Sequence, residues 1–306
     1  MAAVTTGNIP RLLQEGINTI FGDTYDEFAT EWDKAFDDGS SSKAFELDTQ
    51  VEGLGLAEVK DENSDVAFDD FAQGFTPKYI NLTYALGFIM TEEALEDQLY
   101  DQGLGKSRSL AFSMSSTKEV VAANILNRAS NDNFTMPGGD GLGLLSAVHV
   151  NGPSGGTYSN ELAVTADLSE ASLEDIMIQI GKATDPRGIN IALQGVRVIV
   201  PVDSMFEAQR ITGSVLRSGT AENDTNAIRD LNVLPGGFEV MHRITDTNAW
   251  FVKTNAPRGL RYFTRRARQI REDNAFSTGN ARVKADERYS FGWSDPRGIY
   301  GSMGSS

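Results

Sequence analysis

The residue types that most often carry catalysis or bind metals are scarce in this chain of 306 residues, which has no cysteine and two histidines, His149 and His242. The lack of cysteine excludes disulfides and thiolate metal sites, and it is typical of a protein made in a reducing cytoplasm. Ser146 lies close to His149 in sequence, but His149 stands between Val148 and Val150 and no Ser/His/Asp set can be assembled around it. We therefore interpret His149 as structural and assign no catalytic residue.

Two glycine-containing segments resemble phosphate-binding loops without completing either motif. Gly105-Lys106-Ser107 matches the end of a P-loop, but the motif requires another glycine five residues before Gly105, where this chain has Tyr100. The glycines of residues 138–143 lack the third glycine of the dinucleotide-binding motif. The acid pairs Asp37-Asp38 and Asp69-Asp70 lack the ligand spacing and closing glutamate of an EF-hand loop. No nucleotide, other cofactor or metal is assigned.

The charges are distributed unevenly along the chain, whose formal net charge is −16. Residues 1–106 contain 22 acidic and 6 basic side chains, whereas residues 107–306 contain 21 of each. Within the balanced part, residues 256–291 hold 9 basic and 4 acidic side chains. A molecule that is acidic at one end and basic near the other can dock on its own copies, because opposite potentials steer association. The alternative is that the acidity serves only solubility.

An arginine-rich segment near the C-terminus has two interpretations. Its arginines are interleaved with Tyr262 and Phe263, a composition found on nucleic-acid-binding surfaces. They can equally lie on a strand and pair with carboxylates of a neighbouring molecule, which we favour because the first third of the same chain supplies a matching acidic excess. The arginines in question are Arg258, Arg261, Arg265, Arg266, Arg268 and Arg271.

The elements that must position these charges follow from the spacing of apolar residues. Residues 11–36 have near-helical spacing and predict two short amphipathic helices separated at Gly22-Asp23. Residues 45–90 alternate in part and have a polar tip at 60–65, which predicts a long hairpin. Because an isolated hairpin is marginally stable, we expect it to rest on another part of the molecule or on another copy. We expect neither the arm nor the hairpin to contain a core of its own.

The rest of the chain predicts a long helix and a compact mixed segment. Leu110, Met114, Val121 and Ile125 lie on one face of a helix over residues 106–129, about 36 Å long at 1.5 Å per residue. A helix capped by Ser169 or Ser172, a buried strand at 196–200 and further short strands follow. Alternation resumes over 259–300 around a turn at 274–280. No run of about 18 apolar residues is present, so no membrane association is expected.

This order of elements, together with local sequence, resembles the Hong Kong 97-type capsid fold of tailed bacteriophages. The segment RLLQEGINTIFGDTYDEFATEWDKAF resembles the N-terminal arm of Mu-like major head subunits. GLGLLSAVHV, followed by ADLSEASLEDIMIQIGKATDPRGINIALQGVRVIVPVDSMFEAQRI, is similar to the passage that enters the axial domain of that family. The resemblance implies an α+β fold with an N-terminal arm, an extended β-hairpin loop, a long spine helix, a peripheral domain and an axial domain.

The resemblance also implies boundaries for these parts. The N-terminal arm would cover residues 1–44 and the extended loop residues 45–90. The peripheral domain would consist of residues 91–145, which include the spine helix, and of the strands in residues 256–291. The axial domain would cover residues 146–255, and residues 292–306 would form a strand that returns to it.

The function implied is that of a major capsid protein, not an enzyme, which assembles as hexamers and pentamers into an icosahedral shell around the double-stranded DNA of a tailed phage. It would be located in the virion capsid after assembly in the bacterial host cytoplasm. Expected partners are a portal, a separate scaffold protein, a possible decoration protein and packaged DNA contacted non-specifically. The alternatives are an encapsulin-like nanocompartment shell that encloses protein cargo, and an acidic soluble binding protein or enzyme that remains a monomer.

The charge pattern adds a hypothesis about the contact between subunits. Acidic side chains of the hairpin are expected to lie over the arginine-rich strand of a neighbouring copy. The acidic residues are Glu58, Asp61, Glu62, Asp65, Asp69 and Asp70, and the basic residues are Arg261, Arg265, Arg266, Arg268 and Arg271.

Overall fold

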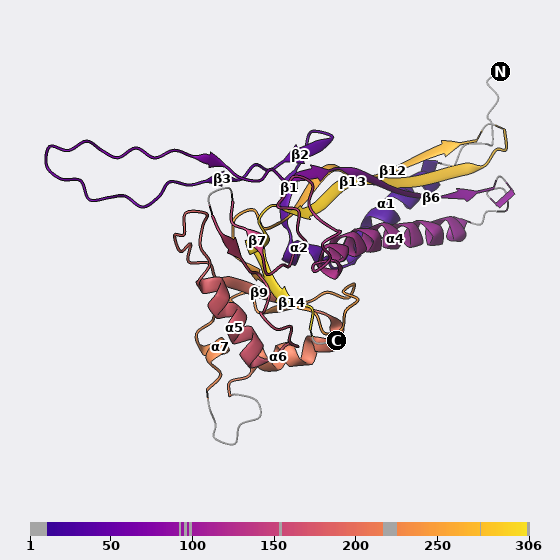
Figure 1. Ribbon diagram of the computed structural model, residues 1–306. Helices are drawn as coiled ribbons and strands as arrows, with labels where there is room; N and C mark the ends of the chain where they lie inside the picture. The colour runs from indigo at the N-terminus through magenta and orange to yellow at the C-terminus, as the bar shows by residue number, and fades with distance from the viewer. Residues whose placement is uncertain are drawn as a thin grey trace.

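The computed structural model describes residues 11–91, 93–94, 97, 100–152, 155–216, 225–275 and 277–304. The chain forms two sheet-and-helix bodies, and a long hairpin projects from the region where they meet (Figure 1). The sequence Thr91-Glu92-Glu93 also predicts a helix start, with a capping residue followed by acids, but Glu92 lies outside the described residues.

The first body is built on a four-stranded sheet of order β1-β12-β13-β6. Its two longest strands are antiparallel neighbours, as the alternation over residues 259–300 predicts, and the short β1 runs parallel to β12. Apolar side chains on one face of the sheet pack onto a long helix, while the opposite face carries charged residues. The elements are β1 (Asp37–Ser40), β6 (Leu82–Met90), β12 (Leu260–Asn274), β13 (Ala281–Trp293), α1 (Arg11–Glu27), α2 (Trp32–Ala35) and α4 (Tyr100–Asn127).

The long helix α4 confirms the predicted spine helix but begins earlier than expected. It runs through Gly103 and Gly105, which the sequence suggested would interrupt it. Gly103 lies against the end of the Met90 side chain, so a Cβ there would meet the Met90 sulfur at 2.9 Å and this flexible side chain would have to shift. Within this helix Ser107 Oγ donates to the Ile17 carbonyl (2.9 Å) and Lys106 Nζ to the Ile89 carbonyl (3.2 Å). The P-loop-like residues therefore fasten the helix to its neighbours.

The second body contains a four-stranded sheet of order β10-β9-β11-β14 with helices packed against it. Ser169 begins α5 with a reciprocal pair of hydrogen bonds to Ser172, which confirms the predicted helix start. The predicted strand at 196–200 is β9, whose Val198, Ile199 and Val200 are buried. The elements are β9 (Gly195–Val200), β10 (Phe238–Val240), β11 (Trp250–Thr254), β14 (Ile299–Ser302), α5 (Glu170–Gly181), η1 (Val202–Ser204), α6 (Met205–Gly213), α7 (Ala227–Asp230) and η2 (Pro296–Gly298).

The N-terminal arm differs from expectation, because it is packed into the first body. Ile17, Phe21 and Tyr25 of α1 are buried against α4 in one apolar cluster. The next segment is held by a carboxylate, since Glu119 of α4 accepts hydrogen bonds from the Glu31 and Trp32 N–H groups at 3.0 and 3.1 Å. The arm therefore has no separate core, as expected, but it is not segregated from the subunit, because its apolar side chains complete the core of the first body.

A buried ion pair connects the arm, the long helix and the sheet. Lys118 Nζ of α4 lies 2.8 Å from Glu287 Oε2 of β13, and both side chains are largely buried. Burial acts to lower the pKa of the Lys118 ammonium, but the adjacent Glu287 carboxylate raises it above its ordinary value. The ammonium also lies within 5.3–5.8 Å of four aromatic ring centroids, those of Tyr25, Trp32, Tyr262 and Tyr289.

Removing one member of this pair should destabilise the subunit strongly. We expect Glu287→Leu to lower the free energy of unfolding by about 3–5 kcal/mol, because Lys118 would remain buried without a counter-charge. The double variant Glu287→Leu with Lys118→Met should recover most of that loss, since two apolar side chains can occupy the site. Urea unfolding of the unassembled subunit, followed by circular dichroism, measures both.

The exposed pair Lys34–Asp33 provides the control for this experiment. Asp33→Ala should change the free energy of unfolding by less than about 1 kcal/mol. Unfolding of Glu287→Leu at the urea concentration of the wild type would contradict the role assigned to the buried pair.

Candidate assembly surfaces

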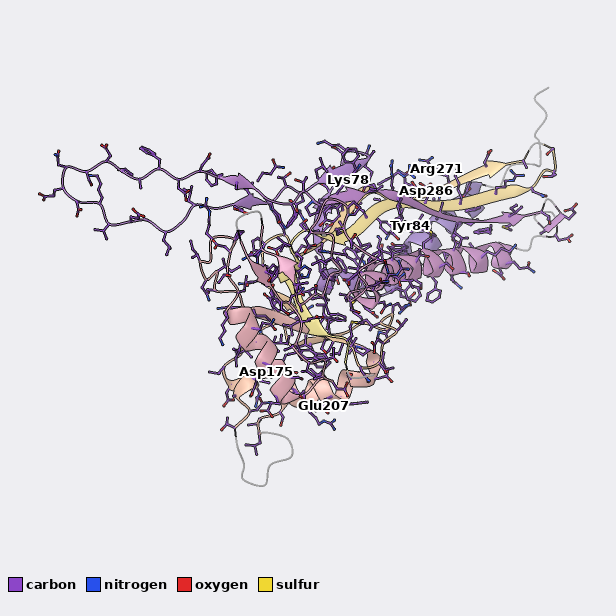
Figure 2. The ribbon with its side chains drawn as sticks, in the orientation of Figure 1. Lys78, Tyr84, Asp175, Glu207, Arg271 and Asp286 are labelled. Atoms are coloured by element: carbon purple, nitrogen blue, oxygen red, sulfur yellow. The ribbon has the colours of Figure 1, made fainter. Side chains whose placement is uncertain are left out.

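The hairpin forms short ladders near its base and none toward its tip. β2 (Phe45–Leu47) pairs with β5 (Lys78–Ile80), and β3 (Val51–Glu52) pairs with β4 (Ala72–Gln73). Residues 53–71 contain no strand and are all exposed. Figure 2 shows their side chains projecting into solvent on both sides of the loop.

The Asp48 carboxylate, which was not among the residues selected from the sequence, attaches the base of the hairpin to the first body. Asp48 Oδ2 accepts hydrogen bonds from Arg261 (2.8 Å) and from the Ser294 hydroxyl (2.6 Å). Arg258 lies 3.5 Å from the other Asp48 oxygen and donates to the Thr49 carbonyl. An acidic residue of the hairpin thus pairs with the arginine-rich strand within one chain, at the base of the hairpin.

A second attachment joins the hairpin to the second body. Asp69 Oδ2 accepts from the Gly55 N–H at 2.8 Å, which links the two arms of the loop. Arg187 donates to Asp69 Oδ1 at 3.3 Å and to the Asp70 carbonyl at 2.9 Å. The Gly55 and Asp70 amides, and then Arg187, hold the pKa of the Asp69 carboxyl below its ordinary value. Asp69 and Asp70 therefore have partners within their own chain, whereas Glu58, Asp61, Glu62 and Asp65 lie exposed around the tip.

The arginines of β12 are less free than the sequence suggested. Arg268 forms two hydrogen bonds with Asp26 of α1, at 2.5 and 2.6 Å, and these lower the pKa of the Asp26 carboxyl. Arg266 pairs with Asp286 of β13. Arg261, Arg266 and Arg268 therefore each have a carboxylate partner within their own chain. Arg265 is exposed and makes no hydrogen bond or ion pair within the described residues.

The adjacent strand β13 adds basic residues to the same region, which sequence reasoning did not include. Ala281, Val283 and Ala285 are buried, so Arg282 and Lys284 point to the opposite, exposed face. The register places Arg271 opposite Lys284 and Arg266 opposite Arg288. Like charges directly opposite each other across a ladder repel. Acidic side chains of another molecule would therefore reduce the electrostatic repulsion on this face of the sheet. We name it the basic face and define it as Arg265, Arg266, Arg271, Arg282, Lys284 and Arg288.

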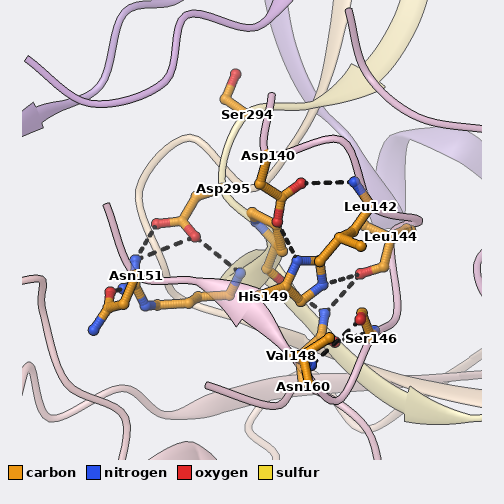
Figure 3. Close-up of polar contacts among 12 residues, drawn as sticks. Asp140, Leu142, Leu144, Ser146, Val148, His149, Asn151, Asn160, Ser294 and Asp295 are labelled. Atoms are coloured by element: carbon orange, nitrogen blue, oxygen red, sulfur yellow. Dashed lines mark hydrogen bonds and ion pairs between the residues drawn. The ribbon is translucent and has the colours of Figure 1, made fainter. Parts of the chain in front are cut away.

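The histidine that was considered for catalysis lies in a structural junction (Figure 3). His149 is fully buried, and its Nδ1 lies 2.5 Å from Asp140 Oδ2 while its Nε2 lies 3.3 Å from the Leu144 carbonyl. Ser146 Oγ instead accepts from the Val148 N–H at 3.3 Å. The Asn160 amide donates to the carbonyls of Leu144, Pro296 and Ile299, which fixes the loop against the C-terminal strand.

Within the described ranges, no helix is long and apolar enough to cross a membrane. No group of three or more histidine or carboxylate side chains in the same ranges is placed to hold a metal ion.

Comparison with known proteins connects this geometry to a family. A family model described as phage capsid protein matches residues 78–302. The chain belongs to the phage capsid protein family. No curated protein sequence is significantly similar to it. A capsid protein of this family is a structural subunit that associates with its own copies in an icosahedral shell, and its location is the virion capsid.

Solved structures agree on the fold. A virus-like particle from Pyrococcus furiosus superposes with a TM-score of 0.56 at 12% identity, covering 94% of this chain and 98% of that chain. The capsid of Myoviridae phage XM1 gives 0.54 at 10% identity over 91% and 93%. The capsid of a native GTA particle gives 0.57 at 12% identity over 91% and 92%. The predicted Hong Kong 97-type fold is confirmed, while the finer resemblance to Mu-like subunits and the domain boundaries stay predictions.

We expect Arg187 to control the direction of the hairpin. Because the chain has no cysteine, spin labels can be placed at Lys60→Cys and Asp175→Cys and their distance distribution measured by pulsed electron paramagnetic resonance. Arg187→Gln should broaden that distribution. Arg210→Gln, which removes an exposed ion pair with Glu207 on α6, should leave it unchanged.

The same labels should show a pH dependence with a defined sign. A carboxylate whose pKa is lowered in the folded state keeps its contacts above its ordinary pKa and loses them as the pH falls through the lowered value. The distribution should therefore stay narrow as the pH enters the ordinary aspartate range and broaden only below it. Broadening that begins above that range would contradict the Asp69 attachment.

Proposed function

We propose that this chain is the major capsid protein of a tailed phage, with a structural rather than a catalytic role. It forms hexamers and pentamers, and the closed shell encloses double-stranded DNA. The observation that carries the proposal is the separation of two complementary surfaces on one subunit. The acidic tip of the hairpin and the basic face of the first sheet each lack partners for several of their charges, and they lie at different places on the molecule (Figure 2).

The contact that we propose is between the hairpin tip of one copy and the basic face of a neighbour. The tip contributes Asp61, Glu62 and Asp65, which are exposed. The basic face contributes Arg265 and Lys284, whose side chains make no hydrogen bond or ion pair within the described residues. It also contributes Arg271, whose described side-chain partner is the neutral Gln269. We retain Arg261, Arg266 and Arg268 as secondary participants only, because their guanidinium groups already pair with carboxylates of the same chain.

The energy of such a contact is small for one pair and large for a shell. An exposed ion pair contributes about 0–1 kcal/mol. Repetition at every subunit of a symmetric shell multiplies that contribution, and the charge pattern selects the register of docking. Assembly should weaken with salt, because the Debye length falls from about 10 Å at 0.1 M to about 3 Å at 1 M.

Further partners follow from the same proposal. A portal and a separate scaffold protein would act during assembly in the bacterial host cytoplasm, and a decoration protein could add to the outside of the shell. The net charge of −16 disfavours tight binding to phosphates, so packaged DNA would be contacted non-specifically.

The second candidate is a shell that encloses protein cargo, as in encapsulins. The fold shared with a virus-like particle from Pyrococcus furiosus is compatible with it. The family match to phage capsid protein favours the phage shell. The content of purified particles, nucleic acid or protein, discriminates between the two.

Charge reversal tests the proposed contact. The triple variant Arg265→Glu, Arg271→Glu and Lys284→Glu should remain folded, because all three side chains are exposed, but its shell yield should fall sharply. Adding Asp61→Lys, Glu62→Lys and Asp65→Lys should restore assembly at least in part. Sedimentation and electron microscopy measure the yield, and assembly of the first triple variant at the level of the wild type would refute the contact.

A further inference from the structure

An apolar groove lies between the helix α4 and the strands β5 and β6. Its cavity volume is about 440 Å³, which is large enough for a small molecule or for side chains of a peptide. On the strand side, Ile80 and Leu82 are 50% and 55% exposed. The lining also includes Tyr84, Val121, Phe134 and Tyr289. Apolar side chains gathered around an open groove indicate a contact with another molecule.

Two cations that line this groove have no carboxylate partner within the described residues. Lys78 Nζ lies 4.2 Å from the centroid of the Phe45 ring, and the Arg128 guanidinium lies 5.1 Å from that of Phe134. These rings hold the two charges in place but leave their N–H groups available for an anion. The side-chain amide of Asn124, which also lines the groove, makes no hydrogen bond within the described residues. The chain has 43 acidic and 27 basic residues, so the lack of an acidic partner here is not a matter of composition.

The groove and the basic face lie on opposite sides of the first sheet. Tyr289 lines the groove, whereas its neighbour Arg288 belongs to the basic face, because alternate side chains of a strand point to opposite sides. The contact between copies that we propose above uses the basic face and therefore leaves the groove uncovered. Its occupant must come from elsewhere.

The strand beside the groove favours a peptide over a small amphiphile. The outer edge of β6 has no strand partner in the described chain, and its nine residues carry no charge. An open edge offers main-chain hydrogen bonds to an extended segment, and a neighbouring pocket for its side chains adds specificity. A ligand without a peptide backbone would leave these groups unused.

We propose that this groove is a docking site for an extended acidic segment of a partner protein, in which a large apolar side chain is flanked by carboxylates. The apolar side chain packs against Leu82 and Val121. The carboxylates pair with Lys78 and Arg128, and Asn124 donates to the segment. This inference goes beyond the proposed contact between copies and concerns a different partner on a different surface.

A peptide probe tests the site on free subunits and on purified shells. The probe is fluorescein-labelled Gly-Asp-Phe-Val-Asp-Gly, and its binding is followed by fluorescence anisotropy. Gly-Lys-Phe-Val-Lys-Gly reverses the charges, and Gly-Asp-Ser-Ser-Asp-Gly removes the apolar side chains. The probe should bind roughly tenfold more tightly than either control peptide. Equal binding of the three peptides, or no binding of the probe, would refute the site.

Matched variants assign the binding to the groove. Lys78→Gln with Arg128→Gln should weaken probe binding roughly tenfold. Lys182→Gln with Arg229→Gln removes the same charge from exposed positions on the second body and should leave binding unchanged. Leu82→Glu should abolish it, and thermal unfolding checks that each variant is folded. Equal affinity of the two double variants would overturn the role given to the cations.

The comparison between free subunits and shells identifies the occupant. Probe binding to both means that the groove stays open after assembly, as expected for a partner other than another copy. Binding to free subunits but not to shells would show that a neighbouring copy covers the groove, which would overturn the partner site while leaving the shell function in place. Failure of the wild type to form shells would count against the proposed function, and probe binding to free subunits would still decide whether the site exists.

Discussion

The buried pair of Lys118 and Glu287 is the interaction on which the first body depends. It joins the long helix to the sheet at a point where the aromatic residues of the arm also converge, so three segments far apart in sequence meet at one charge. Such a pair contributes little net stability compared with apolar residues, but it is costly to break, because either charge alone would remain buried. The aromatic rings around the ammonium fill the space that water would otherwise occupy. The arm, helix and sheet are thereby fixed as one unit.

That unit provides the anchorage that the hairpin cannot supply for itself. A two-stranded hairpin is marginal in water, and residues 53–71 of this one are all exposed. The base is held by Asp48, which pairs with Arg261 of β12 and lies near Arg258 just before that strand, and the middle is held by Asp69 and Arg187. The tip beyond those two attachments is free to meet another molecule. A rigid base and an unattached tip suit a loop whose partner lies outside its own chain.

The sequence predicted those parts of the fold that depend on local periodicity. The long helix, the strand at 196–200 and the paired strands over 259–300 were all visible as apolar spacing, because one face of each is buried. The start of α4 was not, since Gly103 and Gly105 lie inside the helix although glycine is a weak helix former.

Which acidic residue pairs with which basic residue could not be predicted from the sequence either. Asp48 and Arg261 are separated by 213 positions and Asp26 and Arg268 by 242, and composition alone cannot indicate which acid meets which base. The outward direction of the Lys284 side chain, by contrast, could be predicted from the alternation of apolar and polar residues along the strand. Lys284 lies between Val283 and Ala285, which are buried, so its own side chain had to face outward.

An uncharged nine-residue edge and an exposed Phe68 are hazards for a free subunit, because they favour pairing with any strand available. The acidic first third of the chain counters this hazard. With a net charge of −16, free subunits repel one another, and the exposed acids of the hairpin tip keep the apolar arm within the most negative region. A partner surface with cations beside an open strand edge reduces the repulsion between the acidic subunits. The same surface offers hydrogen bonds to backbone groups that have none in the free subunit. In the contact that we propose, the basic face meets the acidic hairpin tip of another copy, so the same charges that keep subunits apart in solution would specify where they meet.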